Sequence, residues 1–199
     1  MPRDMEINRE RLKIILKENS VLLGKFKLSS GKESDYYIDA RLTTLHPEGV
    51  YLVGRIFLDE ILRDAEIQAV GGPSMGADPI VGSIIALSYQ SVGAAWRPPP
   101  SLGGVKGRPL SGFLVRKEEK QHGTEKLIEG NLRAGDKAAI VEDVVTTGRS
   151  ILKAIDAVEN AGARVKKVLV IVDREEGARE RLEKTGYEFF SIFRIGELL

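Results

Sequence analysis

Residues 138–150 read AAIVEDVVTTGRS, and this stretch decides the fold. The apolar run Ala138–Val141 predicts a buried strand. Two acids and a short polar turn follow it: Glu142, Asp143, Thr146, Thr147 and Gly148. From Ser150 onward the apolar residues recur at helical spacing, which predicts an amphipathic helix with Ile151, Ala154, Ile155 and Val158 on one face. The stretch therefore predicts a strand, a turn and the start of a helix.

This arrangement suits a phosphate next to a sugar. The free N–H groups and the dipole of a helix N-terminus favour a phosphate. The two carboxylates would repel it, and they suit a neighbouring ribose diol or a bound cation such as magnesium. A triphosphatase loop needs the pattern G-x-x-x-x-G-K-[ST]. The nearest stretch, residues 103–107 (GGVKG), has the wrong spacing and lacks a Ser or Thr after Lys, which argues against a nucleotide triphosphatase.

Residues 141–148, VEDVVTTG, resemble the phosphoribosyl diphosphate signature of type I phosphoribosyltransferases. The resemblance implies an α/β fold with a mainly parallel central sheet, flanking helices and a small N-terminal hood. It also implies that the whole element binds phosphoribosyl diphosphate, through Glu142, Asp143, Val144, Val145, Thr146, Thr147, Gly148, Arg149 and Ser150.

Residues 112–123, GFLVRKEEKQHG, predict a short strand followed by a charged loop that extends to Asn131. Taken alone, such a charge run is usually a solvated surface. Its order R-K-E-x-K-x-H-G, however, is similar to the catalytic loop of orotate phosphoribosyltransferases. The resemblance implies that Arg116, Lys117, Lys120 and His122 meet the diphosphate. Lys120 and His122 would be catalytic, because mobile donors stabilise the charge that develops on the leaving pyrophosphate.

Two more segments resemble parts of the family that bind the pyrimidine base. Residues 23–41 predict a hairpin that resembles the hood of the same family, and Tyr37 would stack on a flat pyrimidine. A surface hairpin with two tyrosines is the alternative. Residues 172–177, VDREEG, resemble the family's Asp-Arg segment, in which Arg174 would grip the carboxylate of orotate in a two-pronged geometry. Thr146 would also face orotate.

The resemblance covers nearly the whole chain, with some departures. Ser29 and Gly76 stand where some relatives carry Lys, which removes two basic contacts to the diphosphate. At Gly76 the backbone can still approach closely, because glycine has no side chain. Residues 92–109 are rich in Pro and Gly and predict an extended insertion. The expected domains are residues 1–45, a helix and the hood hairpin, and residues 46–199, the phosphoribosyltransferase core.

The bulk composition fits a single globular unit. The chain has 199 residues, 42% hydrophobic and 30% charged, with net charge +1 and no cysteine. These values give no general attraction to nucleic acid or an anionic membrane, exclude disulfides and thiolate metal sites, and are compatible with the cytoplasm. No apolar run has membrane-spanning length.

Together these resemblances imply transfer of ribose 5-phosphate from phosphoribosyl diphosphate to orotate, in pyrimidine nucleotide synthesis. Magnesium would be carried by substrate oxygens and not by a protein cage, as suits its reluctance to dehydrate. The resemblance also implies a homodimer with shared active sites. Two alternatives remain: a purine phosphoribosyltransferase, which should lack the hood and the Lys/His loop, and a non-catalytic regulator that senses phosphoribosyl diphosphate on the same fold.

Overall fold

The computed structural model describes residues 3–27, 33–92, 109–117 and 127–199. Along the chain the elements are α1 (Arg3–Asn19), β1 (Val21–Lys27), β2 (Glu33–Ile38), α2 (Arg41–Thr44), α3 (Pro47–Ile61), β3 (Ala69–Pro73), α4 (Asp78–Val92), β4 (Ser111–Val115), β5 (Ile128–Gly130), β6 (Lys137–Val145), α5 (Arg149–Asn160), β7 (Arg164–Asp173), α6 (Ala178–Lys184), β8 (Glu188–Arg194) and a 3₁₀ turn (Ile195–Glu197). No helix in these ranges is long and apolar enough to cross a membrane.

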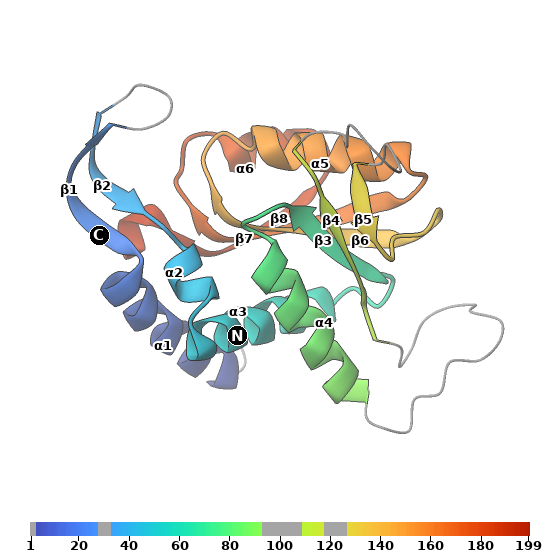
Figure 1. The fold of residues 1–199 in the computed structure, drawn as a ribbon, viewed down its shortest axis with the longest axis horizontal. Helices are drawn as coiled ribbons and strands as arrows, with labels where there is room; N and C mark the ends of the chain where they lie inside the picture. The colour runs from blue at the N-terminus through green and yellow to red at the C-terminus, as the bar shows by residue number, and fades with distance from the viewer. Residues whose placement is uncertain (1–2, 28–32, 93–108, 118–126) are drawn as a thin grey trace.

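The central sheet has six strands in the order β5-β4-β3-β6-β7-β8 (Figure 1). Neighbouring strands pair in parallel from β4 to β8, while β5 pairs antiparallel with β4. The chain leaves β3 toward β4 and leaves β6 toward β7, so the connections diverge between β3 and β6. Ligands of open α/β sheets bind at such a point, outside the carboxyl ends of the strands. The predicted fold class is confirmed.

Helices cover both faces of the sheet. Figure 1 shows α5 and α6 on one face and α1, α3 and α4 on the other, and each set packs on its own apolar cluster. α5 buries the predicted stripe: Ile151, Ala154, Ile155 and Val158. Each large apolar side chain buried in this way contributes roughly 1.5–3 kcal/mol. The N-terminus of α5 is therefore firmly fixed at the ligand-binding edge of the sheet.

Strand β6 is longer than the strand predicted at residues 138–141. It continues to Val145, so both acids lie within the strand and not after it. The reason is the neighbouring strand β7, which pairs with β6 as far as Asp173, whereas the pairing with β3 ends at Ile140. The helix prediction was also off by one residue, since α5 begins at Arg149.

Strand β5 was not predicted and lies within the expected loop, where it pairs with the end of β4. The short helix α2 was not predicted either. Helix α3 starts at Pro47, a residue favoured in the first helical turn, and the His46 side chain caps it by accepting a hydrogen bond from the Gly49 N–H at 3.3 Å. Most of the expected insertion, residues 93–108, lies outside the described residues.

The hood hairpin, β1 and β2, forms a separate two-stranded sheet that projects from one end of the molecule (Figure 1). Helix α1, which precedes it, buries Leu12 and Leu16 in the same apolar cluster as Phe57 of α3. The two sides of the expected boundary at residue 45 thus share one core. The hairpin is anchored at its base, where Ile38 joins that cluster.

Candidate active site

A pair of carboxylates lies near the end of strand β6, at the point where the sheet connections diverge. Glu142 is buried, with 7% of its surface exposed, and Asp143 is partly buried. The Val144 N–H donates to Asp143 Oδ1 at 2.7 Å, and the Ser150 hydroxyl donates to Glu142 Oε2 at 3.3 Å. These contacts link the carboxylates to the strand backbone and to the first turn of α5.

The carboxylate pair is electrostatically perturbed. Burial, together with the neighbouring Asp143 carboxylate, raises the pKa of Glu142 to about 8. Burial also raises the pKa of Asp143, and the Val144 N–H and the positive charge of Arg41 act in the opposite direction. Two adjacent acids in a site of low polarity cannot both ionise cheaply. A ligand that donates hydroxyl hydrogen bonds or carries positive charge would stabilise the ionised carboxylates. A ribose diol beside a magnesium ion has both properties.

The loop after β3 lies directly against this pair. A Cβ placed on Gly76 would come within 2.7 Å of Asp143 Oδ1 and 2.8 Å of Glu142 Oε1. Contacts below 3.0 Å force a displacement, so any side chain here, including the Lys of some relatives, would require the carboxylates to move. Because Gly76 has no side chain, the backbone of the loop after β3 can lie directly against the carboxylates of β6.

The phosphate turn follows β6 and leads into α5. Gly148 has φ +76°, a left-handed conformation that favours glycine, and it precedes Arg149, the first helical residue. The carbonyl of Thr147 accepts a hydrogen bond from Arg181 of α6 at 2.8 Å. Thr146 and Thr147 are partly buried at this turn. The turn is thus held on its far side, and the start of the helix is left to receive an anion.

A basic groove of about 630 Å³ separates the end of β4 from α5. Its cations come from both elements: Arg116, Lys117, Arg149 and Lys153. Arg116 lies 3.5 Å from Glu129, and none of the ion pairs found among the described residues involves the other three. The groove also touches Ser150, which joins it to the carboxylate pair. The predicted cations Lys120 and His122 lie outside the described residues.

On the other side of the carboxylates, the loop after β7 carries Arg174. Its side chain is 11% exposed, and its Nε lies 3.2 Å from Glu176 Oε1. Asp173, which is buried, fixes the loop by accepting from the Glu175 N–H at 2.9 Å, and Arg179 lies 3.6 Å from its other oxygen. The Arg174 N–H donates to the Val145 carbonyl at 3.0 Å. The predicted base-side arginine is therefore tied directly to the end of β6.

The two hood tyrosines face opposite ways, as neighbours in a strand must. Tyr36 reaches Arg174, whose Nη2 donates to the Tyr36 hydroxyl at 3.4 Å. Tyr37, the residue predicted to stack on the base, is 39% exposed and lies beside Phe26, with ring centroids 5.7 Å apart. Sequence reasoning missed Tyr36. The signal available was its alternation with the apolar Ile38, which places both on the inward face.

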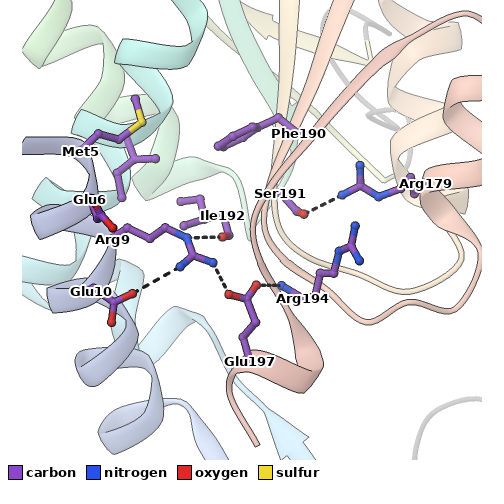
Figure 2. A pocket seen from close by; sticks show the side chains of 11 residues that line it. Met5, Glu6, Arg9, Glu10, Arg179, Phe190, Ser191, Ile192, Arg194 and Glu197 are labelled. Carbon is purple, nitrogen blue, oxygen red and sulfur yellow. Dashed lines mark hydrogen bonds and ion pairs between the residues drawn. The ribbon is translucent and has the colours of Figure 1, made fainter. Parts of the chain in front are cut away.

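A further hollow, of about 510 Å³, lies between α1 and β8 (Figure 2). Three arginines line it, and each lies within ion-pairing distance of a carboxylate: Arg9 with Glu197, Arg179 with Asp173 and Arg194 with Glu175. The Arg9 Nε also donates to the carbonyl of Ile192 on the edge strand β8. The arginines of this hollow therefore pair with carboxylates, and two of these carboxylates, Asp173 and Glu175, flank Arg174 in the loop after β7.

Comparison with known proteins gives the class first. Residues 53–193 match the family model described as the phosphoribosyl transferase domain, so the chain belongs to the phosphoribosyltransferase family. Its relatives narrow this to orotate phosphoribosyltransferases. One from Aquifex aeolicus is 41% identical over 97% of this chain and 98% of the relative. Another, from Pyrococcus horikoshii, is 36% identical over 98% of this chain and 94% of the relative.

Solved structures agree with this narrower class. The structure of Mycobacterium tuberculosis orotate phosphoribosyltransferase in complex with 5-phospho-alpha-D-ribosyl 1-diphosphate has a TM-score of 0.73 against this chain. The two are 33% identical, and the match covers 96% of this chain and 98% of the other.

Proposed function

We propose that this protein transfers ribose 5-phosphate from 5-phosphoribosyl 1-diphosphate to orotate, which yields orotidine 5′-phosphate and diphosphate for UMP synthesis. The main support is the meeting of three features at one edge of the sheet: the carboxylate pair of β6, the helix N-terminus of α5, and Arg174. The carboxylate pair suits the ribose hydroxyls, the helix N-terminus suits the 5′-phosphate, and Arg174 suits the carboxylate of orotate. The near full-length similarity to orotate phosphoribosyltransferases supports the same reading.

The phosphate side of the site would bind phosphoribosyl diphosphate. Backbone N–H groups and hydroxyls of Thr146, Thr147, Gly148, Arg149 and Ser150 would surround the 5′-phosphate at the start of α5. Glu142 and Asp143 would hold the ribose hydroxyls. Val144 and Val145, the last residues of β6, would form the floor of the phosphoribosyl diphosphate site. Arg116, Lys117, Lys120 and His122 would meet the diphosphate, Lys120 and His122 as the catalytic donors.

Magnesium would bind with the substrate. Among the described residues, no group of three or more His, Cys, Asp or Glu is arranged to hold a metal ion. The buried pair Glu142 and Asp143 nevertheless fits an ion that keeps most of its ligands from substrate and water. Such an ion neutralises charge on the diphosphate, while the residues of the chain position the ribose.

The base side would select orotate. A guanidinium can donate two parallel hydrogen bonds to a carboxylate. Arg174 would make these to the orotate carboxylate, and Thr146 would approach the base from the phosphate side. Tyr37 of the hood hairpin would stack on the pyrimidine ring. Uracil, adenine and hypoxanthine lack that carboxylate, so they gain nothing from Arg174.

The test follows loss of orotate absorbance after phosphoribosyl diphosphate and magnesium are added, with uracil, adenine and hypoxanthine as competitors. We expect orotate to be consumed, and none of the competitors to inhibit strongly at equal concentration. Turnover of adenine or hypoxanthine in preference to orotate would indicate a purine enzyme. The absence of turnover with any base, in a protein that still binds phosphoribosyl diphosphate, would indicate a regulator.

A homodimer with shared sites is also part of the proposal, together with a cytoplasmic location. An apolar hollow of about 710 Å³ lies beside the loop after β3 and the base of the hood. Its exposed apolar side chains are Leu42, Leu45 and Met75, at 52%, 73% and 65%. Contiguous exposed apolar surface of this kind marks protein contacts. A second copy seated here would lie next to Gly76 and the carboxylate pair, within reach of the diphosphate.

Mixing of inactive variants tests the shared site. Lys120→Ala and Asp143→Ala should each be nearly inactive alone. After dissociation and reassociation together, hybrid dimers would contain one intact site, with Asp143 from one chain and Lys120 from the other, and activity should return. Hybrids that form but stay inactive would show that each loop serves its own subunit.

A further inference from the structure

The inward-facing hood tyrosine holds the guanidinium of Arg174. The ring of Tyr36 faces that guanidinium, whose carbon lies 5.1 Å from the ring centroid. The Tyr36 hydroxyl lies 3.4 Å from Arg174 Nη2. These are a cation–π contact and a long hydrogen bond, and they join two segments 138 residues apart in sequence. Ser34 supports the strand locally by donating to the Tyr36 carbonyl at 2.8 Å.

The opposite side of the guanidinium is held by Glu176, at 3.2 Å from Nε. Arg174 Nε is buried and has no hydrogen bond of good geometry to any described residue. Nε therefore lies beside Glu176 and Nη2 beside Tyr36, so the guanidinium is contacted on both flanks before any substrate binds. A free arginine side chain has large rotamer entropy, and confinement before binding removes part of that cost.

We propose that Tyr36 is a positioning residue for base selection, which acts through Arg174 and not by direct contact with the base. The inference rests on the proposed function, because it gives Arg174 the orotate carboxylate as its ligand. It assigns the aromatic face of Tyr36 to pre-orienting the guanidinium. Tyr37, on the outer face of β2, has no contact with Arg174 and takes no part in this step.

The sharpest test compares two substitutions of similar bulk. Tyr36→Phe keeps the aromatic face, so the KM for orotate should stay within about threefold of wild type, because the hydrogen bond it removes is long and weak. Tyr36→Leu keeps an apolar side chain but loses the face. Its KM for orotate should rise about tenfold, the equivalent of about 1.4 kcal/mol. The KM for phosphoribosyl diphosphate should change less than twofold in both, since the phosphate side is untouched.

A purely structural role would lower the thermal midpoint, more for Leu than for Phe because Tyr36 packs on the core, without separating the KM for orotate from the KM for phosphoribosyl diphosphate. Tyr187→Phe removes a hydroxyl that bonds Glu159 far from the hood, and it serves as the matched control. Equal KM values for the Phe and Leu variants would overturn the proposal. So would a rise in the KM for orotate in Tyr37→Leu with none in Tyr36→Leu.

A double-mutant cycle separates action through Arg174 from direct stacking on the base. In an Arg174→Ala background, Tyr36→Leu should change the KM for orotate by less than about twofold, because the group that it positions is gone. A further tenfold rise in the KM for orotate in this background would show that Tyr36 contacts the base itself, and it would contradict the inference. The wild-type assay is separate: if the wild type fails to use orotate, the proposed function fails, whereas the cycle addresses Tyr36 alone.

Discussion

The phosphate side and the base side of the crevice are built in different ways. Carboxylates, turn and helix start all come from residues 142–150, one continuous segment fixed between β6 and α5. The base side joins Arg174, from the loop after β7, to Tyr36, from the hood. A site made from one segment keeps its geometry wherever that segment folds. A site made from two depends on how the hood packs on the core, so its geometry is more easily altered.

The largest effect is expected on the phosphate side. Asp143→Asn should lower kcat/KM for phosphoribosyl diphosphate about 100-fold, near the upper end for a lost charged hydrogen bond. The fold should persist, because Asp143 is only partly buried and Asn has the same shape as Asp. Steady-state kinetics with varied phosphoribosyl diphosphate measures this.

Asp136→Asn provides the matched control, because Asp136 is a buried acid that accepts from the Arg133 N–H at 3.0 Å in the turn before β6. It should lose thermal stability and keep its kinetic constants. If Asp143→Asn behaves in this same way, Asp143 merely caps a turn, and the ribose role is wrong.

An intermediate effect is expected where the loop after β3 meets the carboxylates. Gly76→Ala would place a Cβ within 2.8 Å of both acids and displace them. We expect the KM for phosphoribosyl diphosphate to rise about tenfold, as for about 1.4 kcal/mol of lost binding, with the KM for orotate nearly unchanged. The control is Gly82→Ala in α4, where a Cβ would meet nothing within 4 Å. Equal kinetics for the two variants would show that the close approach at Gly76 has no role in binding.

The smallest effect is a change in how stability depends on pH. Glu142 has a pKa of about 8 in the folded chain, raised mainly by burial, against 4.5 for an ordinary glutamate. Between these values the folded state holds a proton that the unfolded state has lost, so this group makes stability fall as pH rises from about 4.5 to about 8. Glu142→Gln should make that fall shallower.

Denaturant unfolding at pH 5 and pH 8 measures the difference. The exposed Glu180→Gln on α6 should keep the wild-type slope. A Glu142→Gln protein with the same slope as wild type would show that Glu142 is ionised at neutral pH, and the carboxylates would then repel each other less than the geometry implies.

The same contrast explains what the sequence could predict. The strand, turn and helix at residues 138–150 carry local signals, so the order of elements and the buried stripe of α5 were confirmed. The extension of β6 to Val145 depends on pairing with β7, which no local pattern shows. The alternation of Tyr36 with Ile38 indicates which tyrosine faces inward, but the contact of that face with Arg174 is a property of tertiary packing. The sequence predicted that the backbone at Gly76 approaches the diphosphate, whereas its approach to the carboxylate pair had no local signal.

The central claim is that one side of the crevice binds phosphoribosyl diphosphate and the other selects the base. The most direct test is the ratio of kcat/KM for orotate to that for uracil, in wild type, Asp143→Asn and Arg174→Ala. Arg164→Ala, at the exposed opposite end of β7, is the control for Arg174.

The ratio should be large in wild type and in the control, and preserved in Asp143→Asn even as both rates fall. In Arg174→Ala it should fall by the equivalent of about 1.5–3 kcal/mol. A wild-type ratio near one, or a ratio that Arg174→Ala leaves unchanged, would contradict the account.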